Sequence, residues 1–398
     1  TISNNNSTST GGAVSGIVVE TLTTGTALAG SATNISNNTV GNVTQTAVST
    51  ATYSGIITSS GANVAVTMNN NTVTNVTRNS ATTGAFDGIR ATGTAKSVIM
   101  NGNTVSNISA TGATTAIFNA ITSTGSSTLT DTLAMNNNIV TGNNFAGTGS
   151  FICMNGGLSA GGASISGNQV TNNQKTGASG LFDGVTFTGS STLTDTLAMS
   201  NNTVSGNVLN GTGTMTLMDA GAAVKITMNN NLVNNNQKSG ASGTMYCSRA
   251  GTSQITYSGN TISNNSIPTS SGTTAASIYG YYNLGSPTLE IYTNNNINNL
   301  SIGGTNTSTS SLIYGMYSNS TASSVKEYSG NTVHTLSMTT PGNMIGIHNA
   351  LGTVNIFKNK IYNLSSSGAS ATAQVDGIRL TSGTNTKVYN NIIGDLRS

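Results

Sequence analysis

An asparagine followed two residues later by Val or Ile recurs along the whole sequence at intervals of about 32 residues. Two duplications reveal this interval. Thr124–Met135 and Thr188–Met199 both read TGSSTLTDTLAM, an offset of 64 residues, and Asn172–Gly180 returns as Asn235–Gly243 at an offset of 63. The recurring asparagine, called here the anchor asparagine, stands at Asn38, Asn71, Asn103, Asn138, Asn168, Asn202, Asn231, Asn260, Asn295, Asn331, Asn359 and Asn391.

Two apolar columns accompany the anchor asparagine. Two residues after it stands Val or Ile in every repeat, from Val40 to Ile393, and three residues before it an apolar residue, from Ile35 to Val388. Stacked parallel strands produce such columns, because each coil places its side chain over the same side chain of the coil below. The sequence therefore predicts an all-β chain, a single-stranded parallel β-helix of about twelve coils, right-handed by the rule for parallel crossovers.

A column of small residues is expected on a second strand, about 17 residues after each anchor asparagine. Gly16, Gly55 and Gly88 begin this column, and glycine there suggests a bend where a Cβ would be crowded. By this count Gly156 and Ala220 also belong to it, and Arg249 is its one misfit.

The anchor asparagines have two interpretations. An internal ladder would let each side-chain amide donate to one neighbouring coil and accept from the other, and asparagine also tolerates the left-handed backbone of a corner. A row of asparagines on an exposed face would instead bind sugar hydroxyls or water. Because apolar columns flank the asparagine in every repeat, we favour the structural ladder.

Composition limits the classes of function. Only 6% of the residues are charged and the formal net charge is +3, so nucleic-acid binding has no electrostatic support. There is no apolar stretch long enough to span a membrane. The two cysteines, Cys153 and Cys247, lack metal-type spacing, and we expect neither a bridge between them nor a cofactor. Residues 1–398 are expected to form one continuous β-helix domain.

Few residues suggest chemistry. Asp183 and Asp219 are expected in one outward column of neighbouring coils, at a spacing that suits a retaining glycosidase, with Asp87 and Asp376 farther along it. The simpler interpretation is a polar column in which aspartate is one of several small residues. With Tyr281, Tyr282 and Tyr317, the two aspartates form a candidate carbohydrate face. We predict no catalytic residue and no metal site.

The last two repeats, Asn355–Leu364 (NIFKNKIYNL) and Val375–Ile378 (VDGI), resemble the β-helical repeats of large Bacteroidota surface proteins exported by the type IX secretion system. The resemblance implies a secreted, cell-surface protein. In addition, Asp131-Thr132-Leu133 and Asp195-Thr196-Leu197 resemble the O-glycosylation acceptor of those bacteria, which makes Thr132 and Thr196 candidate modification sites.

Two functions are therefore expected as alternatives. The first is a non-enzymatic extracellular solenoid, an adhesin stalk or filament subunit that contacts flanking repeats or other copies end to end. The two ends of the sequence fall at nearly the same phase of the repeat, so we expect a segment of a longer exported protein. The second is a solenoid that binds or cleaves polysaccharide on the face with Asp183 and Asp219. Glycans and the secretion machinery are the other expected partners.

Overall fold

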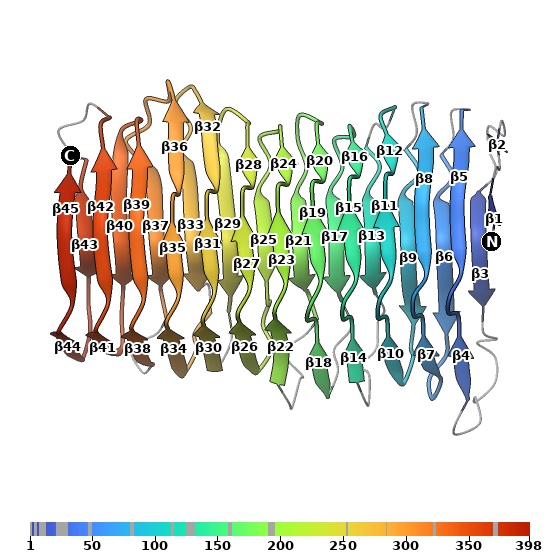
Figure 1. Cartoon of the computed structure of the whole chain (residues 1–398), viewed down its shortest axis with the longest axis horizontal. Helices are drawn as coiled ribbons and strands as arrows, with labels where there is room; N and C mark the ends of the chain where they lie inside the picture. Colours follow the sequence, from blue (N-terminus) through green and yellow to red (C-terminus); the bar gives the residue numbers. More distant parts are fainter. Residues whose placement is uncertain are drawn as a thin grey trace. The chain divides into compact units, whose positions relative to one another are not determined.

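The computed structural model describes residues 2–3, 6–7, 13–20, 31–46, 50–79, 83–112, 115–124, 132–157, 161–189, 196–251, 254–283, 285–320, 324–368 and 373–398. These residues form strands, turns and bends, and no helix. Two compact units divide the chain, unit 1 (Thr1–Ala198) and unit 2 (Met199–Ser398), and each is described by itself. Within each unit the strands form three parallel sheets, A, B and C, as in a β-solenoid (Figure 1).

The strands of unit 1 are as follows. Sheet A contains β1 (Ile2–Ser3), β2 (Asn6–Ser7), β5 (Thr39–Gln45), β8 (Thr72–Arg78), β11 (Thr104–Ser106), β12 (Ser109–Ala110), β15 (Ile139–Thr141), β16 (Asn144–Phe145), β19 (Gln169–Thr171) and β20 (Gln174–Lys175). Sheet B contains β3 (Val14–Glu20), β6 (Tyr53–Ser60), β9 (Phe86–Gly93), β13 (Phe118–Ser123), β17 (Phe151–Gly156) and β21 (Phe182–Phe187). Sheet C contains β4 (Ala32–Asn34), β7 (Ala65–Thr67), β10 (Ser97–Ile99), β14 (Thr132–Ala134) and β18 (Gly162–Ser164). The unit boundary falls inside β22 (Thr196–Ser200).

Unit 2 repeats this arrangement. Sheet A contains β23 (Thr203–Ser205), β24 (Val208–Leu209), β27 (Leu232–Asn234), β28 (Gln237–Lys238), β31 (Thr261–Ser263), β32 (Ser266–Ser270), β35 (Asn296–Asn298), β36 (Ser301–Gly304), β39 (Thr332–Met338), β42 (Lys360–Ser366) and β45 (Ile392–Arg397). Sheet B contains β25 (Met215–Asp219), β29 (Gly243–Ala250), β33 (Ala276–Asn283), β37 (Ser311–Ser318), β40 (Gly342–Asn349) and β43 (Val375–Leu380). Sheet C contains β26 (Lys225–Asn229), β30 (Gln254–Ser258), β34 (Leu289–Thr293), β38 (Val325–Ser329), β41 (Thr353–Phe357) and β44 (Asn385–Tyr389).

The predicted Val/Ile column is confirmed by the register of sheet A. In unit 1 Val40 pairs with Val73, and the column continues to Val170. In unit 2 the same position runs from Val204 to Ile393. Val73 and Ile297 are fully buried. Burial of these stacked β-branched side chains stabilises the contact between consecutive coils. The favourable free energy is about 25 cal/mol for each Å² of apolar surface removed from water.

The asparagine ladder is also confirmed, with one correction. In unit 1 the Nδ2 of Asn71 donates to the Oδ1 of Asn103 at 3.1 Å, and Asn103 donates to Asn138 at 3.0 Å. Each Nδ2 also donates to a main-chain oxygen, as Asn103 does to Met68 at 2.7 Å. The left-handed residue of the corner is not the anchor, however. It is the residue before the anchor, such as Asn70 with φ 55°. The hydrogen-bond ladder and the left-handed corner, which the sequence suggested for one asparagine, therefore belong to two adjacent residues.

The small-residue column lies in sheet B, where the described register corrects part of its membership. Cys153 and Cys247 stand in this column, since their strand neighbours pair on either side of Ala120 and Gly280 respectively. Gly156 pairs with Phe187 instead, and Arg249 pairs with Tyr282. The connections between sheets differ in length, so a fixed count from the anchor asparagine selects the wrong residue in some coils. Both cysteines are buried, and they are free, so the predicted absence of a bridge between them is confirmed.

At Gly55 the column requires glycine, because the next coil of sheet B and a side chain of sheet A both lie close to its Cα. A Cβ on Gly55 would lie 2.4 Å from the carbonyl oxygen of Gly88 and 2.8 Å from a methyl group of Val73. The predicted bend interrupts the alternation of inward and outward residues, since Gly55 and Ile56 are consecutive and both buried. After this pair, the phase of inward and outward residues is reversed.

Candidate functional site

The proposed carboxylate column does not include Asp219. In unit 2 the residues that pair along sheet B in line with Asp376 are Ile345, Tyr314, Tyr279, Tyr246 and Thr216. Asp219 lies three residues beyond Thr216 and pairs with Arg249. The predicted column is therefore wrong, because Leu217 and Met218 are both buried and carry the strand past the bend before Asp219. Asp183 belongs to unit 1, where it pairs with Ile152.

Arginine side chains contact three aspartates of sheet B, namely Asp87, Asp219 and Asp376. Arg249 donates from Nε to Asp219 at 2.8 Å, and its NH2 nitrogen lies 2.7 Å from the same oxygen. Asp87 accepts from Arg90 at 3.0 Å, and Asp376 from Arg379 at 2.5 Å. Each of these pairs leaves the surface locally neutral.

Tyr281 does not face solvent. Its side chain is fully buried and packs between Tyr257 and Tyr292, with ring centroids 4.4 Å and 5.0 Å away. Its place on the candidate face is therefore wrong. The physical reason is the phase reversal at the bend, since Gly280 and Tyr281 both point inward.

Tyr282 and Tyr317 do face outward, and they stack at 5.1 Å with only 8° between the ring planes. Four further rings extend this pair into one cluster on sheet B of unit 2. We call the whole set the tyrosine surface; it comprises Tyr246, Tyr279, Tyr282, Tyr314, Tyr317 and His348.

Two parallel columns build the tyrosine surface. Tyr246, Tyr279 and Tyr314 pair in one column, and Tyr282, Tyr317 and His348 in the next. They are three residues apart along each strand because the inward pair at the bend lies between them. Within a column, neighbouring tyrosine rings lie 5.1–5.4 Å apart with 8–31° between their planes, so their faces are turned toward each other. A ligand would therefore contact the edges and the phenol hydroxyls of these rings, since their faces are covered by neighbouring rings.

The rings of the tyrosine surface are uncharged near neutral pH, and the charged groups beside them are the arginine–aspartate pairs. Burial raises the pKa of the phenols of Tyr279, Tyr282 and Tyr317. Burial, with help from Arg379, lowers the pKa of His348 to about 4. His348 is only 7% exposed and is packed against Tyr314 and Tyr317.

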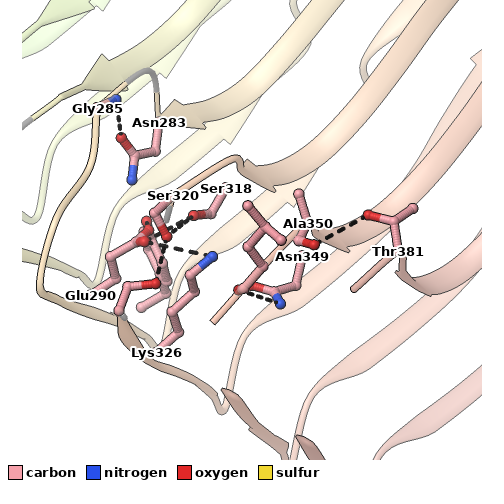
Figure 2. Close-up of polar contacts among 12 residues, drawn as sticks. Asn283, Gly285, Glu290, Ser318, Ser320, Lys326, Asn349, Ala350 and Thr381 are labelled. Carbon is pink, nitrogen blue, oxygen red and sulfur yellow. Dashed lines mark hydrogen bonds and ion pairs between the residues drawn. The ribbon is translucent and has the colours of Figure 1, made fainter. Parts of the chain in front are cut away.

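A second group of polar residues, not predicted from the sequence, lies inside unit 2. Glu290 and Lys326 are both fully buried, on β34 and β38 (Figure 2). They stand five residues before their anchor asparagines, at a position that is Ile226, Ile255 and Val354 in other repeats of the unit. Two opposite charges in adjacent repeats of an aliphatic column are the signal that could have revealed them.

A second asparagine ladder was also missed. Asn143 donates to Asn173 at 2.8 Å in unit 1, and Asn207 to Asn236 at 2.9 Å in unit 2. These residues stand five after the anchor asparagine, where several other repeats have Val, Ile or Leu. Because both ladders are internal, these asparagines are not free to bind a ligand.

The candidate glycosylation sites lie at the starts of two strands. Thr132 opens β14 and is exposed, and Thr196 opens β22 and is half-buried. Asp131 and Asp195, the other half of the acceptor motif, lie outside the described residues. Modification at these threonines stays a prediction.

Comparison of the sequence with family models, characterised proteins and solved structures finds no match. Within the described ranges, no three His, Cys, Asp or Glu side chains gather as metal ligands would. Nor does that part of the chain contain a helix long and apolar enough to cross a membrane. The tyrosine surface and the buried pair are therefore the two features on which functional hypotheses rest.

Proposed function

We propose that this protein is a non-enzymatic, extracellular adhesive solenoid that binds a neutral polysaccharide through the tyrosine surface of unit 2. The observation that carries the proposal is the stacked and partly exposed pair Tyr282–Tyr317, which its neighbours extend into two columns of rings on sheet B. Tyrosine suits this task because its ring is apolar while its hydroxyl both donates and accepts hydrogen bonds.

The spacing of the surface favours a polymer over a small ligand. Parallel strands repeat at about 4.8 Å, so the phenol hydroxyls recur at a regular interval along the columns. A sugar chain that lies along them would find hydrogen-bond partners in several consecutive coils. Individually weak contacts of this kind add up, in the way that linked binding sites raise avidity.

The charge pattern favours a neutral ligand. Arg249 pairs with Asp219 and Arg379 with Asp376, so the charged groups that border the rings neutralise each other. Neither an acidic nor a basic polymer gains long-range attraction from such a border. The same pairing favours binding over glycoside cleavage, since Asp219 is engaged by a guanidinium.

The resemblance of the repeats to Bacteroidota surface proteins supports an extracellular, cell-surface location for this binding. Contacts with other copies, with flanking repeats or with secretion machinery stay predictions from the sequence.

Retention on insoluble polysaccharides and binding to a glycan array test the proposal. We expect the wild-type chain to bind at least one neutral polysaccharide, and the double variant Tyr282→Ser/Tyr317→Ser to lose most of that binding. Tyr362→Ser is the matched control, because Tyr362 is 40% exposed and lies on sheet A of the same unit. Equal binding by the double variant would refute the tyrosine surface as the site. Release of reducing ends by the wild type, abolished by Asp183→Asn, would favour the enzymatic alternative.

A further inference from the structure

Glu290 and Lys326 are direct neighbours in an inward column of sheet C in unit 2. β34 and β38 are parallel, and Glu290 pairs with Lys326 in their register. The residues that flank the pair in this column are aliphatic, Ile226 and Ile255 before it and Val354 after it. Both charged side chains have an exposed fraction of 0%. A carboxylate and an amine are therefore enclosed together in the apolar interior.

The carboxylate of Glu290 is held by hydroxyl groups. Ser318 donates to Oε1 at 2.9 Å, and the phenol of Tyr292 donates to Oε2. Tyr292 is itself fully buried. Figure 2 shows the Lys326 side chain directed from β38 toward this carboxylate, with Ser318 and Ser320 beside it. The two carboxylate oxygens are thus in different environments, one near a serine and one near a phenol.

The ammonium of Lys326 has no comparable partners. Its Nζ lies 3.8 Å from Oε1 of Glu290 and makes no hydrogen bond to the described residues. The other buried lysines differ. Lys175 and Lys238 each donate to two main-chain carbonyl oxygens, among them Gly147 at 2.9 Å and Gly211 at 3.0 Å. Among these three buried lysines, Lys326 is the one that faces a carboxylate and donates no hydrogen bond to a main-chain carbonyl oxygen.

A buried, poorly solvated ion pair is costly, because its mutual attraction offsets desolvation only with good hydrogen-bond geometry. Burial lowers the pKa of Lys326 to about 8, although Glu290 opposes the shift. An appreciable fraction of the amine is therefore neutral and nucleophilic in mildly alkaline solution. The fold also fixes nucleophile and carbonyl carbon side by side, which replaces a bimolecular encounter by an intramolecular one.

We propose that Lys326 and Glu290 condense into an intramolecular amide that links two consecutive coils of unit 2. The Nζ–Cδ bond forms and the Cδ–Oε2 bond breaks. Counted from the ammonium–carboxylate pair, one of the three ammonium protons passes to the carboxylate, so that Nζ attacks as a neutral amine. A second proton leaves the nitrogen after attack, Oε2 departs as water with both, and the third stays on the amide nitrogen. The phenol of Tyr292 is placed to give a proton to the leaving oxygen and to regain one from the nitrogen, while Ser318 donates to Oε1, which becomes the amide carbonyl oxygen. No oxidant, metal or co-reactant is needed.

Such a bond would suit a protein that carries mechanical load. It would join β34 to β38 covalently, so that pulling could not separate these strands by breaking hydrogen bonds alone. It would also remove both buried charges and leave a neutral amide, whose carbonyl retains the Ser318 hydrogen bond.

The mass of the folded wild-type chain tests the proposal directly. We expect an intact mass lower than the sequence mass by one water, and a branched peptide that joins the segments around Glu290 and Lys326 after proteolysis. Lys326→Arg keeps the charge but cannot form this amide, and it should restore the full mass. Tyr292→Phe should slow the loss of water after refolding. Peptides that contain Lys238 serve as the matched control and should have unmodified masses.

Two outcomes would overturn the proposal. One is a folded wild-type protein, verified by its β-sheet circular dichroism, that keeps the full sequence mass after prolonged incubation at mildly alkaline pH. The other is a loss of water that maps to residues other than Glu290 and Lys326. Both are decided on the wild-type chain, so the proposal is testable even if Lys326→Arg does not fold.

Discussion

The Nδ2 of Asn260 lies 3.0 Å from the Oδ1 of Asn295 and 2.8 Å from the carbonyl oxygen of Met228. In the other direction, the Oδ1 of Asn260 accepts from both the main-chain and the side-chain nitrogen of Asn231. One buried side chain thus satisfies polar groups in the two coils on either side of its own in unit 2. Such a side chain has a large effect on stability if it is removed, because its partners remain buried.

Asn260→Ala is therefore expected to lower the free energy of unfolding by about 1–3 kcal/mol for each polar group left unsatisfied. The midpoint of urea unfolding measures the loss. Asn319→Ala is the control, since Asn319 is exposed on the connection after β37. Similar midpoints for the two variants would show that the ladder contributes no more than a surface asparagine.

Gly55→Ala is expected to destabilise unit 1, because a Cβ at this position meets backbone that cannot move aside. The nearest atom would be the carbonyl oxygen of Gly88, at 2.4 Å. Overpacking of a dense interior typically costs about 1–3 kcal/mol. Thermal unfolding followed by circular dichroism measures this loss. Gly61→Ala is the matched control, since nothing lies within 4 Å of a Cβ there, and its melting temperature should stay unchanged or rise slightly. Equal melting temperatures for Gly55→Ala and Gly61→Ala would contradict the close contact between Gly55 and the carbonyl oxygen of Gly88.

Much of this fold was predictable because a stacked coil repeats the same physical environment. Val73 and Asn71 meet the same neighbours as their counterparts one coil away, so their columns are visible in the sequence. The connections between sheets vary in length, and this variation explains the errors at Gly156 and Arg249. Distance from the anchor asparagine predicts register reliably only within a few residues of it.

The tyrosine surface was harder to predict because the strand reverses its phase at the bend. If inward and outward residues alternated strictly from an inward Gly280, Tyr281 would face outward, and Tyr279 and Tyr282 would lie on opposite faces of the sheet. With Gly280 and Tyr281 both inward, Tyr279 and Tyr282 become neighbours on the outer face, 4.6 Å apart between ring centroids. The buried pair Glu290–Lys326, by contrast, was visible five residues before the anchor asparagine.

His348 gives unit 2 a specific sensitivity to acid. Its pKa is lowered from 6.5 to about 4 by burial and by Arg379, with Lys326 adding to the shift and Asp376 opposing it. Between these values the unfolded chain binds a proton that the folded chain does not, so stability falls as the pH drops through this window. From pH 7 to pH 5 we expect a loss of about 2 kcal/mol from this group.

Urea unfolding of the wild type and of His348→Gln at both pH values checks this expectation. The variant should show a smaller loss between pH 7 and pH 5. His334→Gln is the control, because His334 stacks on Tyr362 and is only half-buried, so its removal should change the pH dependence much less. A titration of His348 followed by NMR should give a midpoint near pH 4, and a midpoint near 6.5 would contradict its burial among Tyr314 and Tyr317.

Lys238 is expected to act as a structural cation at a corner of unit 2. Its ammonium donates to the carbonyl oxygens of Gly211 and Ser242, on two successive connections, and its side chain is fully buried. Lys238→Met keeps most of the apolar packing but leaves both carbonyls without this donor, at a cost of about 1–3 kcal/mol. Lys225→Met is the matched control, since Lys225 is exposed at the start of β26. Amide hydrogen exchange should rise in residues 210–213 and 239–243 of the Lys238 variant alone. Unchanged exchange there would mean that the corner is held by its main-chain hydrogen bonds, such as that from Ser239 to Leu209, without help from the lysine.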